Sequence, residues 1–330
     1  MRIGSHDTDD VVVVVAEIGN NHEGDVGVAL ELTERAAEAG AHAVKLQAID
    51  PERLVQPSQA DRIAQLERFR LQPDEFAAVA ERARSRDLAF MCTPFDLEAV
   101  RWLEPLVDAY KIASGDNDVA PLIECCAATG KPVVISTGMG GLEAARASQT
   151  AVATHGAPFA ALHCVSSYPT PPEAAHLATI PALRAELDCT VGYSDHTLGM
   201  EACVVAVALG ARILEKHVTL AHDFSDFRDH QLAADPVEFR VLCEQVAAAE
   251  LLIGEPARGV LAEEEAVAAA ARRSICAARN LNAGEVIGPD DLTWLRPGGG
   301  LRPGQEEQLV GRVLKRAIAY GEPLGPADVA

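Results

Sequence analysis

Eight short apolar segments of this chain each end in polar or ionisable residues. Among these residues are two lysines, several serines, a few carboxylic acids and two histidines that end neighbouring segments. Such a set can hold an anion, bind a divalent metal ion and transfer protons. The candidate site residues in and after these segments are Glu17, Lys45, Gln47, Lys111, Ser114, Asp116, Ser136, Ser166, Tyr168, Ser194, His196, His217 and Asp229.

Two lysines, Lys45 and Lys111, lie within apolar segments and therefore need anions beside them. They could hold a phosphate or a carboxylate, helped by the glycine-rich turn Gly138–Gly141 at the start of a predicted helix. The hydroxyl groups that could join them are those of Ser114, Ser136 and Ser194. The alternative is that each lysine pairs with a nearby carboxylate of the chain.

The two histidines His196 and His217 end the seventh and eighth apolar segments. Neighbouring parallel strands lie about 4.8 Å apart, so both imidazoles can reach one metal ion. Glu17 and Asp229 are the acidic neighbours, and no cysteine shares these positions. Two nitrogens completed by oxygen ligands suit Mn²⁺, with Mg²⁺ or Co²⁺ as alternatives, better than a structural Zn²⁺ site. Taken singly, either histidine could instead be a hydrogen-bonded core residue.

The elements that must position these residues alternate between short apolar and longer amphipathic segments, which is typical of parallel strands joined by helices. The predicted strands cover 11–16, 42–47, 88–92, 108–113, 132–136, 159–164, 189–193 and 211–217. The predicted helices cover 25–39, 74–86, 97–104, 118–129, 142–154, 176–186, 199–209 and 236–253. This pattern predicts a (β/α)8 TIM barrel, whose chemistry lies at the carboxyl ends of the strands. A doubly wound open sheet is the alternative, but Glu17–Gly24 after the first strand lacks its GxGxxG pattern.

The domain organisation follows from a change near the C-terminus, where the alternation of strand-like and helix-like segments gives way to short strands and turns. We expect the barrel over 1–254, a connector over 255–271 and a small domain of short strands and turns over 272–330. Ser274–Ala278 reads as a strand of that small domain. Beyond the alternation of strands and helices, we identify no internal repeat.

Charge and cysteine usage exclude several classes of function. The chain has 28 Lys and Arg against 49 Asp and Glu, a formal net charge of −21, so nucleic acids and anionic membranes would repel it. No apolar segment is long enough to span a membrane, and none has the form of a secretion signal. The eight cysteines form no CxxC pair, so we expect reduced thiols and a cytoplasmic location.

The motifs, taken in order, resemble those of the N-acetylneuraminate (sialic acid) synthase family. They are Ala16-Glu-Ile-Gly-Asn-Asn-His-Glu-Gly24, Val44-Lys-Leu-Gln47, Cys92-Thr-Pro-Phe-Asp96, Tyr110-Lys-Ile-Ala-Ser-Gly115, Ile135-Ser-Thr-Gly-Met139, Gly192-Tyr-Ser-Asp-His-Thr-Leu-Gly199 and Glu215-Lys-His217. Arg272-Arg-Ser-Ile275 and Leu295-Arg-Pro-Gly298 resemble the family's C-terminal antifreeze-like (SAF) domain. The resemblance covers nearly the whole chain.

This resemblance implies an enzyme that joins phosphoenolpyruvate to the open-chain aldehyde of an amino sugar such as N-acetylmannosamine. The products are a nonulosonic acid and phosphate. By resemblance, phosphoenolpyruvate binds Lys45, Lys111, Ser114, Ser136 and Ser194, the metal ion binds His196 and His217, and the acceptor lies near Glu17, Gln47, Asp116, Tyr168 and Asp229. Arg296 would come from the small domain of a partner subunit in a domain-swapped homodimer.

Three departures from the family pattern concern mainly the acceptor. Ser166 stands where many bacterial members have Asn, and Asp116 stands where some have Glu. The loop Thr219–His230 is one residue longer than usual. The identity of the acceptor therefore stays open.

Two readings from other classes also stay open. One is a pyruvate lyase that forms a Schiff base on Lys111, which needs a lysine with a depressed pKa. The other is a non-catalytic sugar-binding protein, for which the altered 219–230 loop is the only argument.

Overall fold

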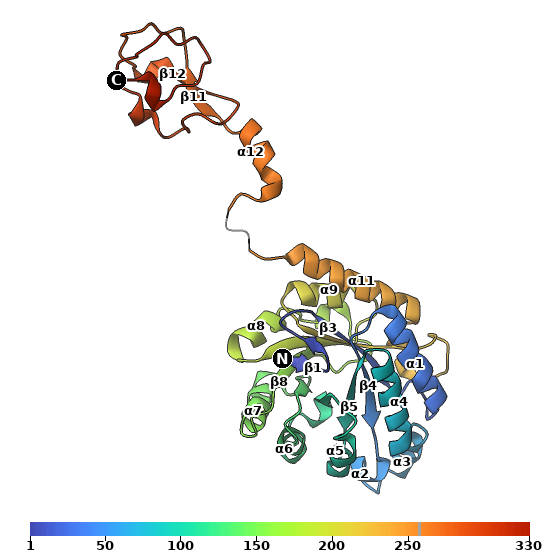
Figure 1. Ribbon diagram of the computed structural model, residues 1–330. Coiled ribbons are helices and arrows are strands. Elements are labelled where there is room, and N and C mark those ends of the chain that lie inside the picture. The colour runs from blue at the N-terminus through green and yellow to red at the C-terminus, as the bar shows by residue number, and fades with distance from the viewer. Residues whose placement is uncertain (257–258) are drawn as a thin grey trace. The chain divides into compact units, whose positions relative to one another are not determined.

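Eight parallel strands close into a barrel in the computed structural model, which describes residues 1–256 and 259–330 (Figure 1). Going round the barrel, the strands follow chain order, and the last pairs with the first. They are β3 (Val13–Gly19), β4 (Ala43–Ala48), β5 (Ala89–Pro94), β6 (Ala109–Ile112), β7 (Val133–Ser136), β8 (Phe159–Cys164), β9 (Thr190–Asp195) and β10 (Ile213–His217). The predicted TIM barrel is confirmed and the open sheet is excluded.

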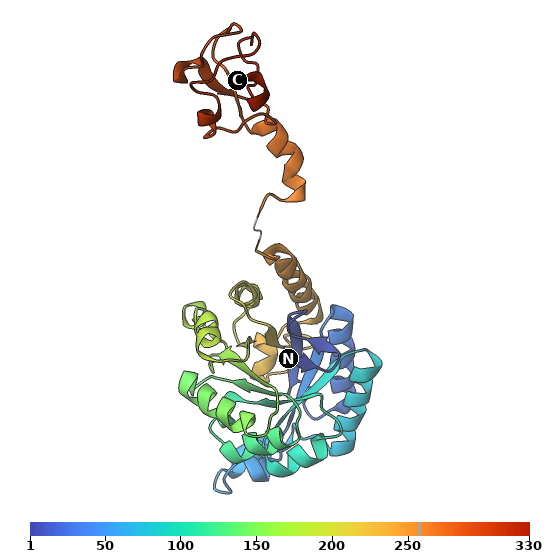
Figure 2. The same cartoon turned by 60° about the vertical axis from the view of Figure 1, so that its left-hand side comes forward.

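Helices surround the barrel, and Figure 2 shows them as an outer layer around the strands. Those that follow successive strands are α1 (Val26–Ala39), α4 (Pro73–Ser85), α5 (Leu97–Leu103), α6 (Ala120–Ala128), α7 (Gly141–Ala153), α8 (Thr179–Glu186), α9 (Glu201–Ala208) and α11 (Pro236–Ile253). Local signals set their ends: Asp25 caps the first backbone N–H groups of α1, and Gly40 ends α1 in a left-handed conformation.

Short helices that the periodicity did not predict lie in the segments after β4 and β10. They are α2 (Pro51–Leu54), α3 (Ala60–Glu67) and α10 (Arg228–Leu232). Each lies on the side of the barrel where strands end, so these segments can line whatever binds there.

The barrel interior is packed at the ends where the strands begin. Val13, Ala43, Ala89 and Ala109 form one buried cluster there, together with Ile3. Ile3 comes from an N-terminal hairpin of β1 (Arg2–Ile3) and β2 (His6–Asp7), which the sequence pattern did not predict. A second apolar cluster fills the layer between strands and helices. With both faces covered, the strands are almost wholly apolar until their carboxyl ends, where the polar residues lie.

The chain divides into two compact units, Met1–Gly254 and Glu255–Ala330. Residues 257 and 258 of the predicted connector lie outside the described residues. The second unit contains α12 (Glu265–Ala271) and the antiparallel strands β11 (Ser274–Ala277) and β12 (Leu292–Leu295), with a small apolar core of its own.

This second unit contains an internal repeat, so the prediction of no further repeat is wrong. Arg279 forms ion pairs with Glu285 and Asp291, and Arg316 forms the same pairs with Glu322 and Asp328. In both copies the aspartate also accepts a hydrogen bond from a glycine N–H, that of Gly288 or Gly325. Each copy consists mainly of turns, so the hydrophobic periodicity used to find helices and strands gives no signal for this repeat.

Within the described residues, no helix combines the length and the apolar character needed to cross a membrane.

The N-terminal hairpin predicts a stability effect. Ile3 is fully buried, so Ile3→Ala removes methyl groups from the barrel core and should cost about 2–5 kcal/mol of unfolding free energy. Val237→Ala is the control, because Val237 is 71% exposed, and it should change stability by less than about 0.5 kcal/mol. Urea unfolding followed by circular dichroism measures both. Equal midpoints for the two variants would contradict the packing role of the hairpin.

Candidate active site

Four charged side chains form a buried cluster where the barrel strands end. Lys45 Nζ lies 2.9 Å from Glu17 Oε2 and 3.6 Å from Glu215 Oε2, and Lys111 Nζ lies 3.5 Å from Glu215 Oε1. Ser194 donates to Glu215 at 2.9 Å. Both predicted lysines therefore meet, and each already has a carboxylate beside it.

Glu215 is a central member of this cluster that the sequence analysis did not select as a site residue. Its signal was present, because residues two apart on a strand share a face, so Glu215 points to the same side as His217. The register places Glu215 opposite Ser194 on β9, which explains their hydrogen bond.

The two carboxyl groups of the cluster differ in proton affinity. Burial raises the pKa of Glu17, although Lys45 opposes this. Burial also acts on Glu215, but Lys111 and Lys45 outweigh it and hold its pKa at about 2. Glu215 thus stays ionised near neutral pH, and Glu17 is the group that can take up a proton.

The two lysines of the cluster also differ in their pKa values. Burial lowers the pKa of Lys111, with Glu215 opposing the shift. Burial acts on Lys45 in the same way, but Glu17 and Glu215 together outweigh it and raise the pKa of Lys45.

Two predicted serines, Ser114 and Ser166, lie on either side of Gly138. A Cβ atom on this glycine would lie 2.5 Å from Ser166 Oγ and 2.6 Å from Ser114 Oγ, so only a glycine fits between the two hydroxyls. The hydroxyls of Ser136 and Ser166 are buried without a hydrogen-bond partner. Unpaired buried donors cost free energy, which favours a ligand with oxygen acceptors.

Asn117 holds this hydroxyl-lined turn in place. Its amide donates to the carbonyl oxygens of Ser136 at 3.1 Å and of Gly138 at 2.8 Å. Asn117 is buried, and the sequence analysis did not select it. Its contacts are with backbone carbonyls, for which the residue type gives no signal.

The predicted histidine pair is brought together, with the ring centroids of His196 and His217 5.6 Å apart. Nδ1 of His196 lies 2.9 Å from the carbonyl oxygen of Val165, which can only accept, so Nδ1 carries a proton and Nε2 is the nitrogen left for a metal ion. Burial disfavours the charged ring, but Cys164 and the Val165 carbonyl outweigh it and raise the pKa of His196, so a metal ion would compete with a proton at Nε2. Burial and the neighbouring His196 lower the pKa of His217 to about 3, which keeps this ring neutral.

Unpaired atoms around the histidines fit a divalent cation. Nδ1 of His217 and Oδ1 of Asp229 are both buried without a hydrogen-bond partner. Neutral imidazole and carboxylate are the ligand types that Mn²⁺ and similar ions accept. The residues present therefore suit the predicted metal ion.

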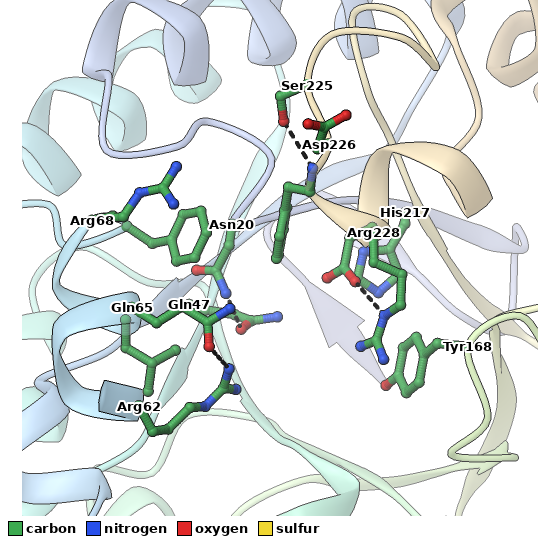
Figure 3. A pocket seen from close by; sticks show the side chains of 14 residues that line it. Asn20, Gln47, Arg62, Gln65, Arg68, Tyr168, His217, Ser225, Asp226 and Arg228 are labelled. Atoms are coloured by element: carbon green, nitrogen blue, oxygen red, sulfur yellow. Dashed lines mark hydrogen bonds and ion pairs between the residues drawn. The ribbon is translucent and has the colours of Figure 1, made fainter. Parts of the chain in front are cut away.

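A cavity of about 900 Å³ opens beside His217 (Figure 3). Predicted residues in its wall are Gln47, Tyr168, His217 and Asp229. The sequence analysis did not select the other residues of the wall. α3 and the turn after it supply Arg62, Gln65, Leu66, Arg68 and Phe69. The loop before α10 and the first residue of α10 supply Ser225, Asp226, Phe227 and Arg228, and the segment after β3 supplies Asn20.

Arg228 connects two of the predicted residues in this wall. Its guanidinium carbon lies over the ring of Tyr168, 5.1 Å from the ring centroid. Its Nε lies 3.6 Å from Oδ1 of Asp229. Gln47, also in the wall, donates to Glu17 at 2.7 Å. Gln47 therefore connects the cavity wall with the charged cluster.

The 219–230 loop is fastened to the turn after β3. Glu23 accepts hydrogen bonds from Ser225 Oγ and from Nε2 of His230, the latter at 3.2 Å. Nδ1 of His230 lies 2.7 Å from the hydroxyl of Thr219, so both ends of the loop belong to one network. This network holds Asp229 beside the cavity.

Two predicted site residues remain to be placed. Asp116 lies two residues after Ser114 in the same 3-10 turn; burial raises its pKa, and its Oδ2 is buried without a hydrogen-bond partner, although it does not line the cavity. Arg296 lies exposed in the second unit, directly after β12, and its role at a partner's barrel stays a prediction.

Among the described residues, one group of three candidate ligands has its atoms within 4.8 Å of one another: His222, Asp235 and Glu238. Asp235 and Glu238 already cap the start of α11 through backbone N–H groups, and His222 lies 3.0 Å from Glu238. We assign this exposed group no metal. Among the described residues, His196, His217 and Asp229 do not form a group this compact, so an ion held by them would need further ligands from substrate or water.

Comparisons with known proteins match nearly the whole chain. The NeuB family model matches residues 32–258, and the SAF domain model matches residues 272–330. The N,N'-diacetyllegionaminic acid synthase of Legionella pneumophila is 33% identical over 330 residues, which cover 94% of this chain and 92% of that protein. The N-acetylneuraminate-9-phosphate synthase of Mus musculus is 32% identical and covers 85% of this chain and 82% of its own.

A solved structure has a similar fold. The N-acetylneuraminic acid (sialic acid) synthetase of Leptospira borgpetersenii, determined with citrate, matches with a TM-score of 0.75 at 31% identity. The match covers 78% of this chain and 90% of that one.

The site predicts a pH dependence of stability. Burial lowers the pKa of His22 from 6.5 to about 4 in the folded protein. As pH falls from about 6.5 to 4, the unfolded chain binds a proton on His22 that the folded chain does not, so stability falls by up to about 1.4 kcal/mol per pH unit from this residue. Above pH 6.5 the effect disappears.

The variant His22→Asn tests this, because Asn can accept the hydrogen bond that Nδ1 takes from the Gly24 N–H. Urea unfolding in EDTA at several pH values should show a shallower loss of stability between pH 6.5 and 4. His155→Asn, at an exposed position, is the control and should follow the parent. Identical slopes for all three proteins would show that His22 titrates normally.

Proposed function

Since the chain belongs to the NeuB family, with a SAF domain at its C-terminus, we propose that it is a phosphoenolpyruvate-dependent synthase of nonulosonic acids. The enzyme joins phosphoenolpyruvate to the aldehyde of an amino sugar and releases phosphate. The observation that carries this proposal is the hydroxyl cradle around Gly138 beside two buried lysines, at the same barrel mouth as the histidine pair.

Phosphoenolpyruvate has two anionic groups, and the site offers matching donors. Lys45 and Lys111 supply positive charge, and the unpaired hydroxyls of Ser136 and Ser166 supply hydrogen bonds. Donors that are already fixed cost little reorganisation when a phosphate leaves, so they stabilise it as its charge grows. Ser194 acts one step away, by fixing Glu215 between the two lysines.

The acceptor binds in the cavity lined by Gln47, Tyr168 and Asp229. His196, His217 and Asp229 would hold the divalent ion, for which we take Mn²⁺ with Mg²⁺ and Co²⁺ as alternatives. When bound, such an ion polarises the acceptor aldehyde. The acceptor is an amino sugar such as N-acetylmannosamine or a di-acetamido deoxyhexose.

Glu17 is the proposed proton carrier. Carbon 3 of phosphoenolpyruvate attacks the aldehyde carbon, and water adds at carbon 2. One proton of the water passes through Glu17 to the former aldehyde oxygen, which becomes a hydroxyl. The bond from carbon 2 to the bridging oxygen then breaks, carbon 2 becomes a carbonyl, and phosphate leaves with the second proton. A carboxyl group with a raised pKa can receive the proton of that water near neutral pH. Gln47 and Lys45 orient Glu17 through contacts of 2.7 Å and 2.9 Å.

Assembly and location are also proposals. By resemblance to the family, a domain-swapped homodimer would bring Arg296 of one chain to the barrel of the other. A guanidinium suits a carboxylate or phosphate of the bound substrate. We place the enzyme in the cytoplasm because its eight cysteines are free.

One observation favours a second function, a pyruvate lyase with Lys111 as nucleophile. The pKa of Lys111 is lowered, as Schiff-base formation requires. Borohydride with pyruvate would trap a stable adduct on Lys111 in a lyase. We expect none, because Lys111 lies 3.5 Å from the ionised Glu215, which favours the charged amine.

The fate of the bridging oxygen tests the synthase. Phosphoenolpyruvate carrying heavy oxygen at the bridge should release labelled phosphate when incubated with Mn²⁺ and either N-acetylmannosamine or a di-acetamido deoxyhexose. Mass spectrometry measures the label. Unlabelled phosphate would mean attack at phosphorus and would remove the role of Glu17. An absence of phosphate release with every amino sugar would favour the sugar-binding protein.

The hydroxyl cradle predicts the effect of one added methyl group. In Gly138→Ala the new Cβ would press against the Ser114 and Ser166 hydroxyls, so affinity for phosphoenolpyruvate should fall at least about tenfold, or about 1.4 kcal/mol. Gly115→Ala is the matched control, because a Cβ there meets nothing within 4 Å. Isothermal titration calorimetry with phosphoenolpyruvate measures both variants. Parent-like affinity of Gly138→Ala would place the phosphate elsewhere.

A further inference from the structure

A buried ion pair lies on the outer face of the barrel, directly behind the two histidines. Asp195 and Lys216 are cross-strand partners on β9 and β10, and each immediately precedes a histidine, His196 and His217. Successive residues of a strand point to opposite faces. The histidines therefore face the barrel mouth, and the ion pair faces the helix layer.

The contacts of Lys216 bracket His196. Its Nζ lies 2.7 Å from Oδ2 of Asp195 and donates to the carbonyl oxygen of Thr197 at 2.6 Å. These are the residues before and after His196. Lys216 itself is the residue before His217, so one ammonium group ties together the backbone positions of both histidines.

Asp195 closes the turn that carries His196. Its Oδ1 accepts from the backbone N–H and from the hydroxyl of Thr197, both at 2.8 Å. Tyr193 donates to the same oxygen at 3.0 Å, and the thiol of Cys203 lies 3.4 Å from Oδ2. His196 is thus the middle residue of a turn whose ends are fixed by one carboxylate.

Stability alone does not explain this arrangement. The side chains of Lys216 and Asp195 are 2% and 0% exposed, and burying two charges costs as much as their attraction returns. An apolar pair of similar volume would fill the same space at no loss of stability. The charged pair differs from an apolar pair in forming directional hydrogen bonds, which hold the backbone N–H and carbonyl of Thr197 in fixed positions.

We propose that the Asp195–Lys216 pair is a positioning element that holds His196 and His217 at the spacing needed to bind one divalent ion. This inference rests on the proposed metal role of the two histidines. Neither Asp195 nor Lys216 touches the ion or the substrate; both act through the backbone of β9 and β10. Groups that hydrogen-bond a ligand imidazole directly contribute about 10–100-fold to metal affinity, and we expect this pair, which acts on the backbone instead, to contribute about tenfold.

The test is Mn²⁺ affinity of the full chain, measured by the electron paramagnetic resonance of free Mn²⁺. The double variant Asp195→Asn with Lys216→Met keeps volume, keeps acceptors for the Thr197 donors and leaves no unpaired charge. It should bind Mn²⁺ about tenfold more weakly than the parent. Its affinity for phosphoenolpyruvate without metal should stay within about twofold, since the lysine and serine contacts are untouched, and a merely structural defect would weaken both.

The control removes another ion pair, located at the opposite end of β10 from His217. Arg212 precedes β10 and lies 3.2 Å from Glu250, far from the histidines along the strand. Arg212→Met with Glu250→Gln should leave Mn²⁺ affinity unchanged. If the Asp195 and Lys216 variant does not fold, Thr197→Val carries the test, because it removes one bond of the turn and keeps the charges. It should bind Mn²⁺ several-fold more weakly.

The outcomes separate this inference from the function on which it rests. Parent-like Mn²⁺ affinity in a folded Asp195 and Lys216 variant, or in Thr197→Val, overturns the positioning role and leaves the metal site standing. Equal loss in the Arg212 and Glu250 control also overturns it. If His217→Ala binds Mn²⁺ as tightly as the parent, the metal role itself fails, and the inference fails with it.

Discussion

Two lysines and two glutamates buried together at the barrel mouth are the interaction on which the rest of the site depends. Charges removed from water must be balanced by close partners, and here Glu215 is shared between Lys45 and Lys111 while Glu17 pairs with Lys45 alone. The cluster is balanced before any ligand arrives. An entering anion adds negative charge, and the group that can compensate by binding a proton is Glu17, because two lysines hold Glu215 ionised. Anion binding and proton uptake are thereby coupled at one residue.

The sequence predicts the barrel well because its pattern has a single physical cause. Strands covered on both faces must be apolar until near the point where they leave the sheet, so Lys111 and His217 mark the strand ends as clearly as they mark the site. Glu215 shows the limit of that reasoning. It is buried and lies on the same face as His217, but the pattern does not tell a carboxylate that balances lysines from one that meets substrate.

The rest of the site depends on contacts that residue types do not encode. The cavity wall formed by Arg62, Arg68 and Arg228 comes from α3, the turn after it and the start of α10, segments too short for a period of 2 or 3.6 to indicate which side chains face inward. The same holds for backbone partners: the proton on Nδ1 of His196 follows from the Val165 carbonyl, and the serine cradle is held by Asn117 through two carbonyls. A sequence can name such donors but not the acceptors that orient them.

Side chains alternate along each barrel strand, so the residues next to an inward-facing site residue face the surrounding helices. Every inward residue of β9 and β10 has neighbours that face the helices. In that layer most such neighbours are apolar, as Val14 and Ala16 are beside Glu17 on β3, and the polar His163 on β8 carries no charge because burial lowers its pKa. Behind His196 and His217 they are Asp195 and Lys216 instead. The departure from an apolar layer occurs where two strands must hold one geometry between them, whereas Glu17 is oriented from within the mouth by Lys45 and Gln47. The loops that carry Asp229 and Arg228 can therefore change with the acceptor while the two histidines keep their spacing.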